Sequence, residues 1–256
     1  MVFLHPGPGL DGSVFLPGAE RLAATHRVFL LDLPGNGQSP APAPEDVSFA
    51  GFARAVDEFA SERGLEDWTL VGHSFGGFVA MQHLIDFPGS AARVVASCTD
   101  CDEEDPPGAP EDPFEGLPED VAASIRAAFE REKSVSTAEE CRAIWADQMP
   151  FFVGSPDRLE TVQAAFAHVV YEPALLRVEE WGQLHALGAL AASEIPILAI
   201  AGERDRITPA PCARRIAATA PRGELLVIEE AGHFPFAETP EAYWDGLGAW
   251  LARTPA

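Results

Sequence analysis

Short apolar runs alternate with helical patterns along most of the chain. Six runs have the length and apolar character of strands that are buried on both faces of a sheet: Val2–Leu4, Val28–Asp32, Trp68–Gly72, Arg93–Cys98, Ile195–Ala201 and Leu225–Glu229. Phe49, Phe52, Val56 and Phe59 follow the spacing of an amphipathic helix, which Gly64 ends. Because strands joined by crossover helices run parallel, the pattern predicts an α/β fold with a six-stranded, mostly parallel sheet and helices on both faces.

Residues 100–190 interrupt this alternation. The segment begins with a stretch rich in Asp, Glu, Pro and Gly, which is typical of an exposed loop, and continues with helical patterns that contain no strand. Because both ends of the segment return to the same sheet, we expect residues 1–99 and 191–256 to form one core. Residues 100–190 are then expected to form a helical cap, or lid, over the carboxyl edge of the strands. A separate helical domain is the alternative.

The stretch Gly72-His73-Ser74-Phe75-Gly76 lies between the third strand and a helical pattern, which is the setting of a nucleophile elbow. Glycine is needed at positions 72 and 76 because the turn is too tight for neighbouring side chains. A helix that starts at such a turn directs its free N–H groups towards the reaction centre. We therefore predict that Ser74 is a nucleophile.

A serine hydroxyl needs a base to take its proton, and the base needs an acid to orient it. Asp205 and His233 each follow an apolar run, and they come after Ser74 in the order acid, then histidine. Both lie where a strand gives way to a loop, the edge at which open α/β sheets bind ligands. Glu203 is the alternative acid, and His73 is expected to pack beneath the elbow.

The glycine-rich stretch His5-Pro6-Gly7-Pro8-Gly9 directly follows the first strand. Acyl transfer builds negative charge on an oxygen atom, which two backbone N–H groups must already face. Phe75, next to the nucleophile, is predicted to supply one. Pro6 has no N–H, so Gly7 is predicted to supply the other. A plain tight turn is the alternative interpretation of this loop.

These motifs together resemble the α/β-hydrolase superfamily, and within it serine hydrolases with a helical cap. The segment Asp32–Ser39 is similar to the D-x-x-G-x-G-x-S turn of that family. The segment Gly232–Pro235, together with Glu238 and Pro240, is a further match to the family. Haloalkane dehalogenases have Asp at the nucleophile position, so Ser74 argues against that branch. The resemblance implies an acyl-enzyme on Ser74 and no metal or organic cofactor. The hairpin that usually opens the family's sheet is expected to be absent.

The resemblance leaves several activities open. Hydrolysis of a carboxylic ester or a related acyl bond is the first expectation. The loop His5–Gly9 is similar to the H-G-G-P-G of proline iminopeptidases, in which lid carboxylates hold a substrate amine; Glu172, Glu179 and Glu180 are the candidates here. Cofactor-free oxygenase or perhydrolase chemistry on the same scaffold is a further alternative. The non-enzymatic alternative is a receptor that binds a ligand without catalysis.

The substrate pocket is expected to accept a small molecule and to be lined by residues of the cap. The aromatic candidates are Trp145, Phe151, Phe152 and Trp181, with His5 on the side of the core. Each aromatic side chain could equally belong to ordinary helix packing.

The charge balance narrows the choice of partners. The 256 residues include 40 Asp and Glu against 17 Lys and Arg, a net charge of −23, which disfavours nucleic acid and anionic membranes as partners. No apolar stretch approaches the roughly 20 residues of a membrane helix, and no signal peptide is recognised. We therefore expect a cytoplasmic protein with reduced cysteines. Cys98 and Cys101 have the C-x-x-C spacing, but a lone pair lacks the other ligands of a zinc site, and no metal is predicted.

Overall fold

A six-stranded sheet lies at the centre of the computed structural model, which describes residues 1–106, 108–178 and 180–255. Its strands are β1 (Val2–Leu4), β2 (Phe29–Leu31), β3 (Thr69–His73), β4 (Arg93–Ser97), β5 (Ile197–Gly202) and β6 (Gly223–Ile228). Every neighbouring pair is parallel, so the predicted fold class is confirmed. β5 begins at Ile197 rather than at the predicted Ile195, because Pro196 has no N–H to donate to the ladder.

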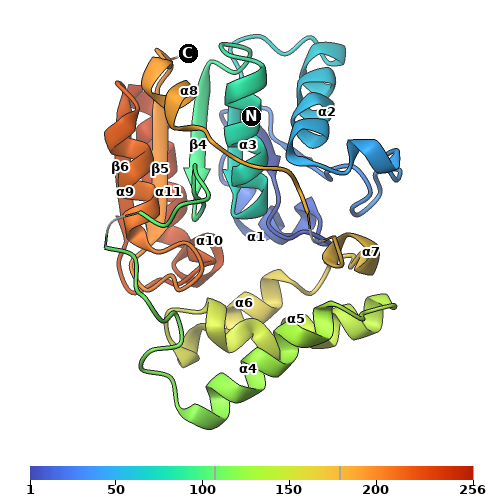
Figure 1. Cartoon of the computed structure of the whole chain (residues 1–256). Coiled ribbons are helices and arrows are strands. Elements are labelled where there is room, and N and C mark those ends of the chain that lie inside the picture. Colours follow the sequence, from blue (N-terminus) through green and yellow to red (C-terminus); the bar gives the residue numbers. More distant parts are fainter. Residues whose placement is uncertain (107, 179, 256) are drawn as a thin grey trace.

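The helices of the described residues surround this sheet (Figure 1). They are α1 (Leu16–Ala19), α2 (Phe49–Glu62), α3 (Phe75–Asp86), α4 (Glu119–Glu132), α5 (Ala138–Phe152), α6 (Leu159–Ala165), α7 (Pro173–Leu176), α8 (Leu187–Ala192), α9 (Ala210–Thr219), α10 (Pro235–Glu238) and α11 (Pro240–Arg253), with short 3-10 turns at Gly12–Phe15, Pro44–Asp46 and Pro156–Arg158. Ser48 caps α2 by accepting from the Gly51 N–H, and Gly64 follows its end at φ +57°, as the sequence predicts. None of these helices is long and apolar enough to cross a membrane.

Successive side chains of the inner strands β1, β3, β4 and β5 enter two different cores. Val2 and Leu4 pack into the core beneath α2 and α3, whereas Phe3 between them packs into the core beneath α11. The same alternation holds in β5, where Ile197 and Leu198 face opposite cores. Because side chains on a strand alternate between faces, fully apolar strands require helices on both sides of the sheet.

The strand order is β2-β1-β3-β4-β5-β6, so the chain moves in one direction from β1 to β2 and then returns to the other side of β1. Such a reversal leaves a crevice at the carboxyl ends of the two strands that flank it, here β1 and β3. The loop His5–Gly9 follows β1, and Ser74 follows β3. The topology therefore brings the glycine-rich loop and the candidate nucleophile to the same crevice.

Helices α4, α5 and α6 lie together beyond the carboxyl ends of the strands (Figure 1). Their buried side chains, such as Ile144, Trp145 and Phe152, belong to the same hydrophobic cluster as the core beneath α11. α5 begins with a capping box formed by Thr137 and Glu140. This shared core favours a cap over a separate helical domain.

The four cysteines are buried free thiols: Cys98, Cys101, Cys141 and Cys212. Burial raises the pKa of each thiol, for Cys101 and Cys141 to about 12. Protonated thiols are weak nucleophiles and weak metal ligands, because both roles require the thiolate.

Gly18 in α1 packs directly against α11. A Cβ atom at this position would overlap the indole of Trp244, which is buried and whose Nε1 donates to the Phe236 carbonyl. We expect Gly18→Ala to lower the free energy of unfolding by about 1–3 kcal/mol, measured by urea denaturation. Gly248→Ala, in α11 with open space around the new methyl group, is the control and should raise stability by about 0.5–1 kcal/mol. Equal stability of the Gly18→Ala protein and the wild type would contradict this packing.

Candidate active site

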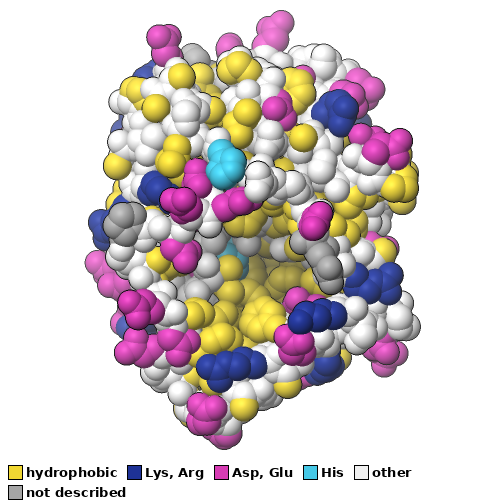
Figure 2. All heavy atoms as spheres, viewed as in Figure 1, with side chains coloured by type: hydrophobic (Ala, Val, Ile, Leu, Met, Phe, Trp, Pro, Cys, Tyr) yellow, Lys and Arg dark blue, Asp and Glu magenta, His cyan; other side chains and the backbone are white. Residues whose placement is uncertain are grey.

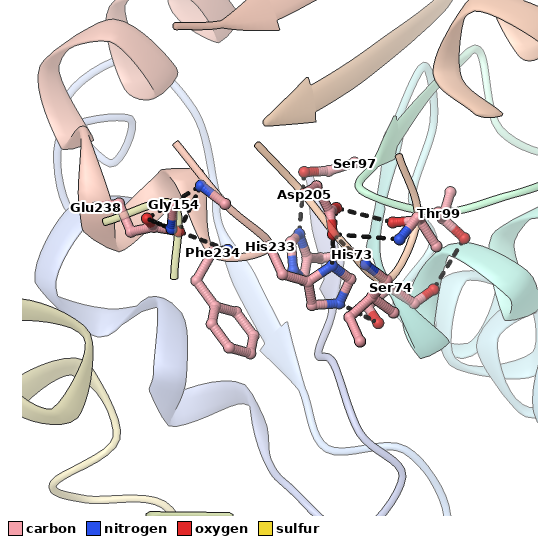
Figure 3. Close-up of polar contacts among 12 residues, drawn as sticks. His73, Ser74, Ser97, Thr99, Gly154, Asp205, His233, Phe234 and Glu238 are labelled. Atoms are coloured by element: carbon pink, nitrogen blue, oxygen red, sulfur yellow. Dashed lines mark hydrogen bonds and ion pairs between the residues drawn. The ribbon is translucent and has the colours of Figure 1, made fainter. Parts of the chain in front are cut away.

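Ser74, His233 and Asp205 meet at the carboxyl edge of the sheet (Figure 3). His233 Nε2 lies 2.8 Å from Ser74 Oγ, and His233 Nδ1 lies 2.9 and 3.1 Å from the two Asp205 oxygens. All three residues are buried. The imidazole can accept the serine proton at one nitrogen while the carboxylate holds the other. Three residues that are far apart in the sequence are thus brought together in the arrangement that was predicted.

The Asp205 carboxylate is held by donors from its own loop. It accepts hydrogen bonds from the Ile207 N–H at 2.8 Å, from the Thr208 N–H at 3.2 Å and from Thr208 Oγ1 at 3.0 Å. These donors fix the orientation of the carboxylate towards His233. Glu203, the alternative acid, is exposed and accepts from the Glu230 N–H instead, so the geometry favours Asp205.

Ser74 occupies a strained backbone conformation, with φ +52° and ψ −118°. A Cβ atom at Gly72 would overlap the backbone of Gly76, and one at Gly76 would overlap the carbonyls of Leu4 and His5. The two glycines are therefore required by close backbone approach, as the elbow motif predicts. Because Gly76 has no side chain, the start of α3 can contact the backbone at the end of β1.

His73 lies beneath the elbow, where the sequence places it. Its ring is fully buried, with Nδ1 3.0 Å from Ser97 Oγ and its centroid 5.3 Å from that of His233. Burial lowers the pKa of His73 well below its usual value, and the neighbouring His233 acts in the same direction. The ring is therefore kept neutral and packs as part of the core.

Gly7 and Phe75 are the two residues predicted to donate to the oxyanion. Phe75 is the first residue of α3, a position whose N–H has no acceptor within the helix. Gly7 lines the same cavity as Ser74 and has φ +142°, a conformation that favours glycine. The arrangement agrees with their predicted role as donors to an oxyanion.

His5 braces the glycine-rich loop and does not line the cavity at Ser74. Its Nδ1 lies 2.7 Å from the Pro6 carbonyl oxygen, and its Nε2 accepts from the Leu33 N–H at 3.1 Å. The Gly9 N–H donates to Asn36 Oδ1 at 3.0 Å, which adds a second tie to the turn after β2. The ring of His5 is fully buried and both nitrogens are engaged, so its place is structural and the predicted contact with substrate is not found.

A cavity of about 290 Å³ lies between the core and helices α4 and α5, with Ser74 and His233 on its wall. Figure 2 shows a hollow between the upper body and the lower helices, with hydrophobic side chains along it. Of the aromatic residues predicted to line a pocket, Trp145, Phe152 and Trp181 do so. Phe151 does not line this cavity and instead stacks on Phe114, with ring centroids 4.5 Å apart.

Eight further residues on the wall were not predicted from the sequence: Pro6, Pro8, Phe129, Glu132, Leu176, Val178, Ile207 and Phe234. Glu132 accepts a hydrogen bond from Gln148 Nε2 at 2.6 Å, and burial raises the pKa of its carboxyl group. The sequence feature that could have identified Glu132 is its helical spacing from Ile125 and Phe129, which places all three on one face of α4.

Glu172 and Glu180, two of the carboxylates predicted to hold a substrate amine, do not line this cavity. Glu172 caps α7 by accepting from the Ala174 N–H at 2.9 Å. Glu180 is exposed, and Glu179 lies outside the described residues.

The family model for the alpha/beta hydrolase fold matches residues 1–240. The chain belongs to the α/β-hydrolase family. It is 30% identical to the pimeloyl-[acyl-carrier protein] methyl ester esterase of Xanthomonas campestris, over 100% of this chain and 96% of the relative. It is also 26% identical to the putative carbamate hydrolase RutD of Escherichia coli, over 95% of this chain and 88% of the relative.

Solved structures show the same fold. An α/β fold family hydrolase from Bacillus anthracis superposes with a TM-score of 0.79 at 20% identity, covering 98% of this chain and 91% of the other. A thermophilic esterase from Thermogutta terrifontis gives a TM-score of 0.74 at 22% identity, covering 100% and 90%. The predicted superfamily and the prediction of an α/β-hydrolase enzyme are thereby confirmed, and the named esterase relatives agree with the predicted hydrolysis of an acyl bond.

Glu238 connects the loop that carries His233 to the residues that follow α5 in this α/β hydrolase (Figure 3). Its carboxylate accepts the N–H groups of Gly154 at 2.7 Å, Gly232 at 3.0 Å and Phe234 at 3.1 Å. Burial raises the pKa of Glu238, while these three donors act in the opposite direction. The His233 N–H donates to the Phe152 carbonyl at 2.6 Å, a second link between the same two segments.

We expect Glu238→Gln to lower the free energy of unfolding by about 1–3 kcal/mol. The amide NH₂ of glutamine cannot accept, so at least one buried N–H of the loop would lose its partner. Urea denaturation measures the effect. Glu241→Gln is the matched control, because the Glu241 side chain is 74% exposed and pairs only with Arg21 at the surface. Similar stabilities for the two variants would show that Glu238 does not hold these loops together.

Proposed function

We propose that this α/β hydrolase cleaves a carboxylic ester, or a related acyl bond, through an acyl-enzyme on Ser74. The observation that carries the proposal is the continuous hydrogen-bonded series from Ser74 Oγ through His233 to Asp205, at 2.8 and 2.9 Å. Relatives named as a methyl ester esterase and a putative carbamate hydrolase support the same class of bond.

In the proposed reaction, Ser74 Oγ attacks the carbonyl carbon while His233 Nε2 accepts its proton. The N–H groups of Phe75 and Gly7 donate to the oxygen that becomes negative. His233 then gives the proton to the departing alkoxide, which leaves the acyl group on Ser74. Water attacks the acyl group in the second half, with His233 again acting as base and then acid, and the free acid leaves. Asp205 orients the imidazole and stabilises its charged form throughout.

Residues 100–190 are proposed to act as the cap of this site. The proposal is supported by the cavity wall, to which the segment contributes Phe129, Trp145 and Phe152 while the core contributes Ser74. A cap that excludes water strengthens the electrostatic interactions of the reaction centre and shapes specificity.

The proposed substrate is a small molecule. A cavity of about 290 Å³ lies at the lower end of the roughly 300–1,000 Å³ that small-molecule sites occupy, which favours a short acyl chain. The net charge of −23 disfavours nucleic acid and anionic lipid as partners. The proposed compartment is the cytoplasm, because four buried free thiols suit a reducing environment. Glu172 and Glu180 do not line the cavity, so these two predicted amine-binding carboxylates give the peptidase alternative no support.

Ser74→Ala is expected to lower turnover of 4-nitrophenyl esters on the order of 10⁶-fold, because the nucleophile and base act as one unit. His233→Ala should be nearly as damaging, and Asp205→Asn should cost about 10⁴-fold, since it disturbs the tautomer and spares the nucleophile. The measurement is kcat for each variant, together with mass-spectrometric mapping of a serine-directed phosphonate. Ser90→Ala, at an exposed serine, is the control and should retain full turnover. A label on another residue, or full activity of Ser74→Ala, would falsify the proposal.

A further inference from the structure

Glu132 is the one acidic side chain on the described wall of the cavity at Ser74. Apart from Ser74 and His233, the other described wall residues are apolar, proline or glycine, and none is Lys or Arg. The carboxylate is half-buried at the end of α4 and faces the same space as the candidate nucleophile. A carboxylate in apolar surroundings costs free energy unless a donor or a cation compensates it.

The compensation within the chain is incomplete. Gln148, which is fully buried in α5, donates its Nε2 to Glu132 Oε1 at 2.6 Å. The other amide atom, Gln148 Oε1, has no hydrogen-bond partner among the described residues. The second carboxylate oxygen of Glu132 likewise accepts no hydrogen bond in the contacts found there. Gln148 Oε1 is buried and Gln148 is not on the cavity wall, so the acceptor left to a ligand is the second Glu132 oxygen. The indole Nε1 of Trp145, a residue of the same wall, is a buried donor that also has no partner among the described residues.

A purely structural role for Glu132 does not require a charge. A neutral glutamine could accept the same hydrogen bond from Gln148 and tie α4 to α5 equally well. Desolvation raises the pKa of the Glu132 carboxyl, which measures the cost of keeping it at this place. A ligand that brings a positive charge or N–H donors would offset that cost, because a charge-assisted hydrogen bond is strong in a site of low dielectric.

We propose that Glu132 selects the substrate. The part of the ester that lies under the cap carries an ammonium or another hydrogen-bond donor, and an ester with a carboxylate at that place binds poorly. The inference deepens the proposed function and rests on it, since the ester is the one that Ser74 attacks. The scissile bond itself is recognised elsewhere, by the elbow and the glycine-rich loop. Glu132 therefore acts on binding of the substituent and takes no part in proton transfer.

Three methyl esters with the same chain of methylene groups test the proposal: methyl 6-aminohexanoate, methyl heptanoate and monomethyl pimelate. They differ only in ending with an ammonium, a methyl group or a carboxylate. A second pair, acetylcholine and 3,3-dimethylbutyl acetate, places the positive or neutral group on the alcohol side. Release of acid is followed in a pH-stat, and the readout is the ratio of kcat/KM between esters within each protein, so that a general change in activity cancels.

The wild type should favour the ammonium ester over the carboxylate ester. Glu132→Gln should reduce that ratio roughly tenfold to a hundredfold, the range that one hydrogen bond between charged groups supplies. Glu130→Gln is the matched control, because it removes the same charge from the same helix at a side chain that is 71% exposed. Its ratio should equal that of the wild type. Thermal unfolding of both variants establishes that each remains folded.

An unchanged ratio in Glu132→Gln on both the acyl and the alcohol side, or an equal change in Glu130→Gln, would overturn the inference and leave the proposed function intact. A wild-type preference for monomethyl pimelate would overturn it as well. Failure of the proposed function has a different result: none of the esters is turned over and the phosphonate does not label Ser74. The rate at which the phosphonate labels Ser74 provides a measurement that needs no turnover. Hexylammonium should slow this labelling more than hexanoate does, and Glu132→Gln should remove the difference.

Discussion

The close contact between the start of α3 and the end of β1 is the constraint on which the candidate site depends. Gly76 lies against the carbonyls of Leu4 and His5, and its N–H donates to the His5 carbonyl at 3.1 Å. Only a residue without a side chain permits this approach. The contact holds Ser74 in its strained conformation and places the glycine-rich loop beside it. The candidate nucleophile and the loop that carries Gly7 are therefore positioned by one backbone contact between α3 and β1.

Three carboxylates around the cavity show how surroundings set what an acid can do. Asp205 accepts from backbone and hydroxyl donors of its own loop and faces His233, which suits an orienting group. Glu238 is fully buried, but backbone N–H groups from two segments surround it, so it suits a structural tie. Glu132 has one side-chain donor and an apolar cavity in front of it. A carboxylate thus orients a catalytic side chain, holds two loops together or remains available to a ligand, according to the number of donors around it.

Residues 100–190 contribute one wall of the cavity at Ser74. The core alone brings together Ser74, His233 and the glycine-rich loop, but α4 and α5 supply the far wall of the cavity. Two hydrogen bonds join the end of α5 to the histidine loop, from the Gly154 N–H to Glu238 and from the His233 N–H to the Phe152 carbonyl. The position of the candidate base His233 therefore depends on the position of the end of α5.

Local patterns in the sequence were sufficient for the sheet, the elbow and the candidate triad. Buried strands are apolar on both faces, a tight turn needs glycine at set positions, and the carboxyl ends of parallel strands share one edge, so Ser74, Asp205 and His233 could be placed there without coordinates. His5 looked like a pocket residue because its loop was correctly placed, yet only the folded chain shows that both ring nitrogens are used within the protein.

The wall of the cavity was decided by tertiary structure. Which face of a cap helix meets the core depends on how α4, α5 and the strands pack together, and helical spacing alone identifies an apolar face without saying what it covers. Phe151 and Phe152 are neighbours in the sequence, but one stacks on Phe114 and the other lines the cavity. Helical spacing placed Glu132 on the same face as Ile125 and Phe129, but nothing local showed that this face meets the cavity. Periodicity and turn chemistry act within a few residues, whereas the environment of a single carboxylate is set by segments that meet only when the chain has folded.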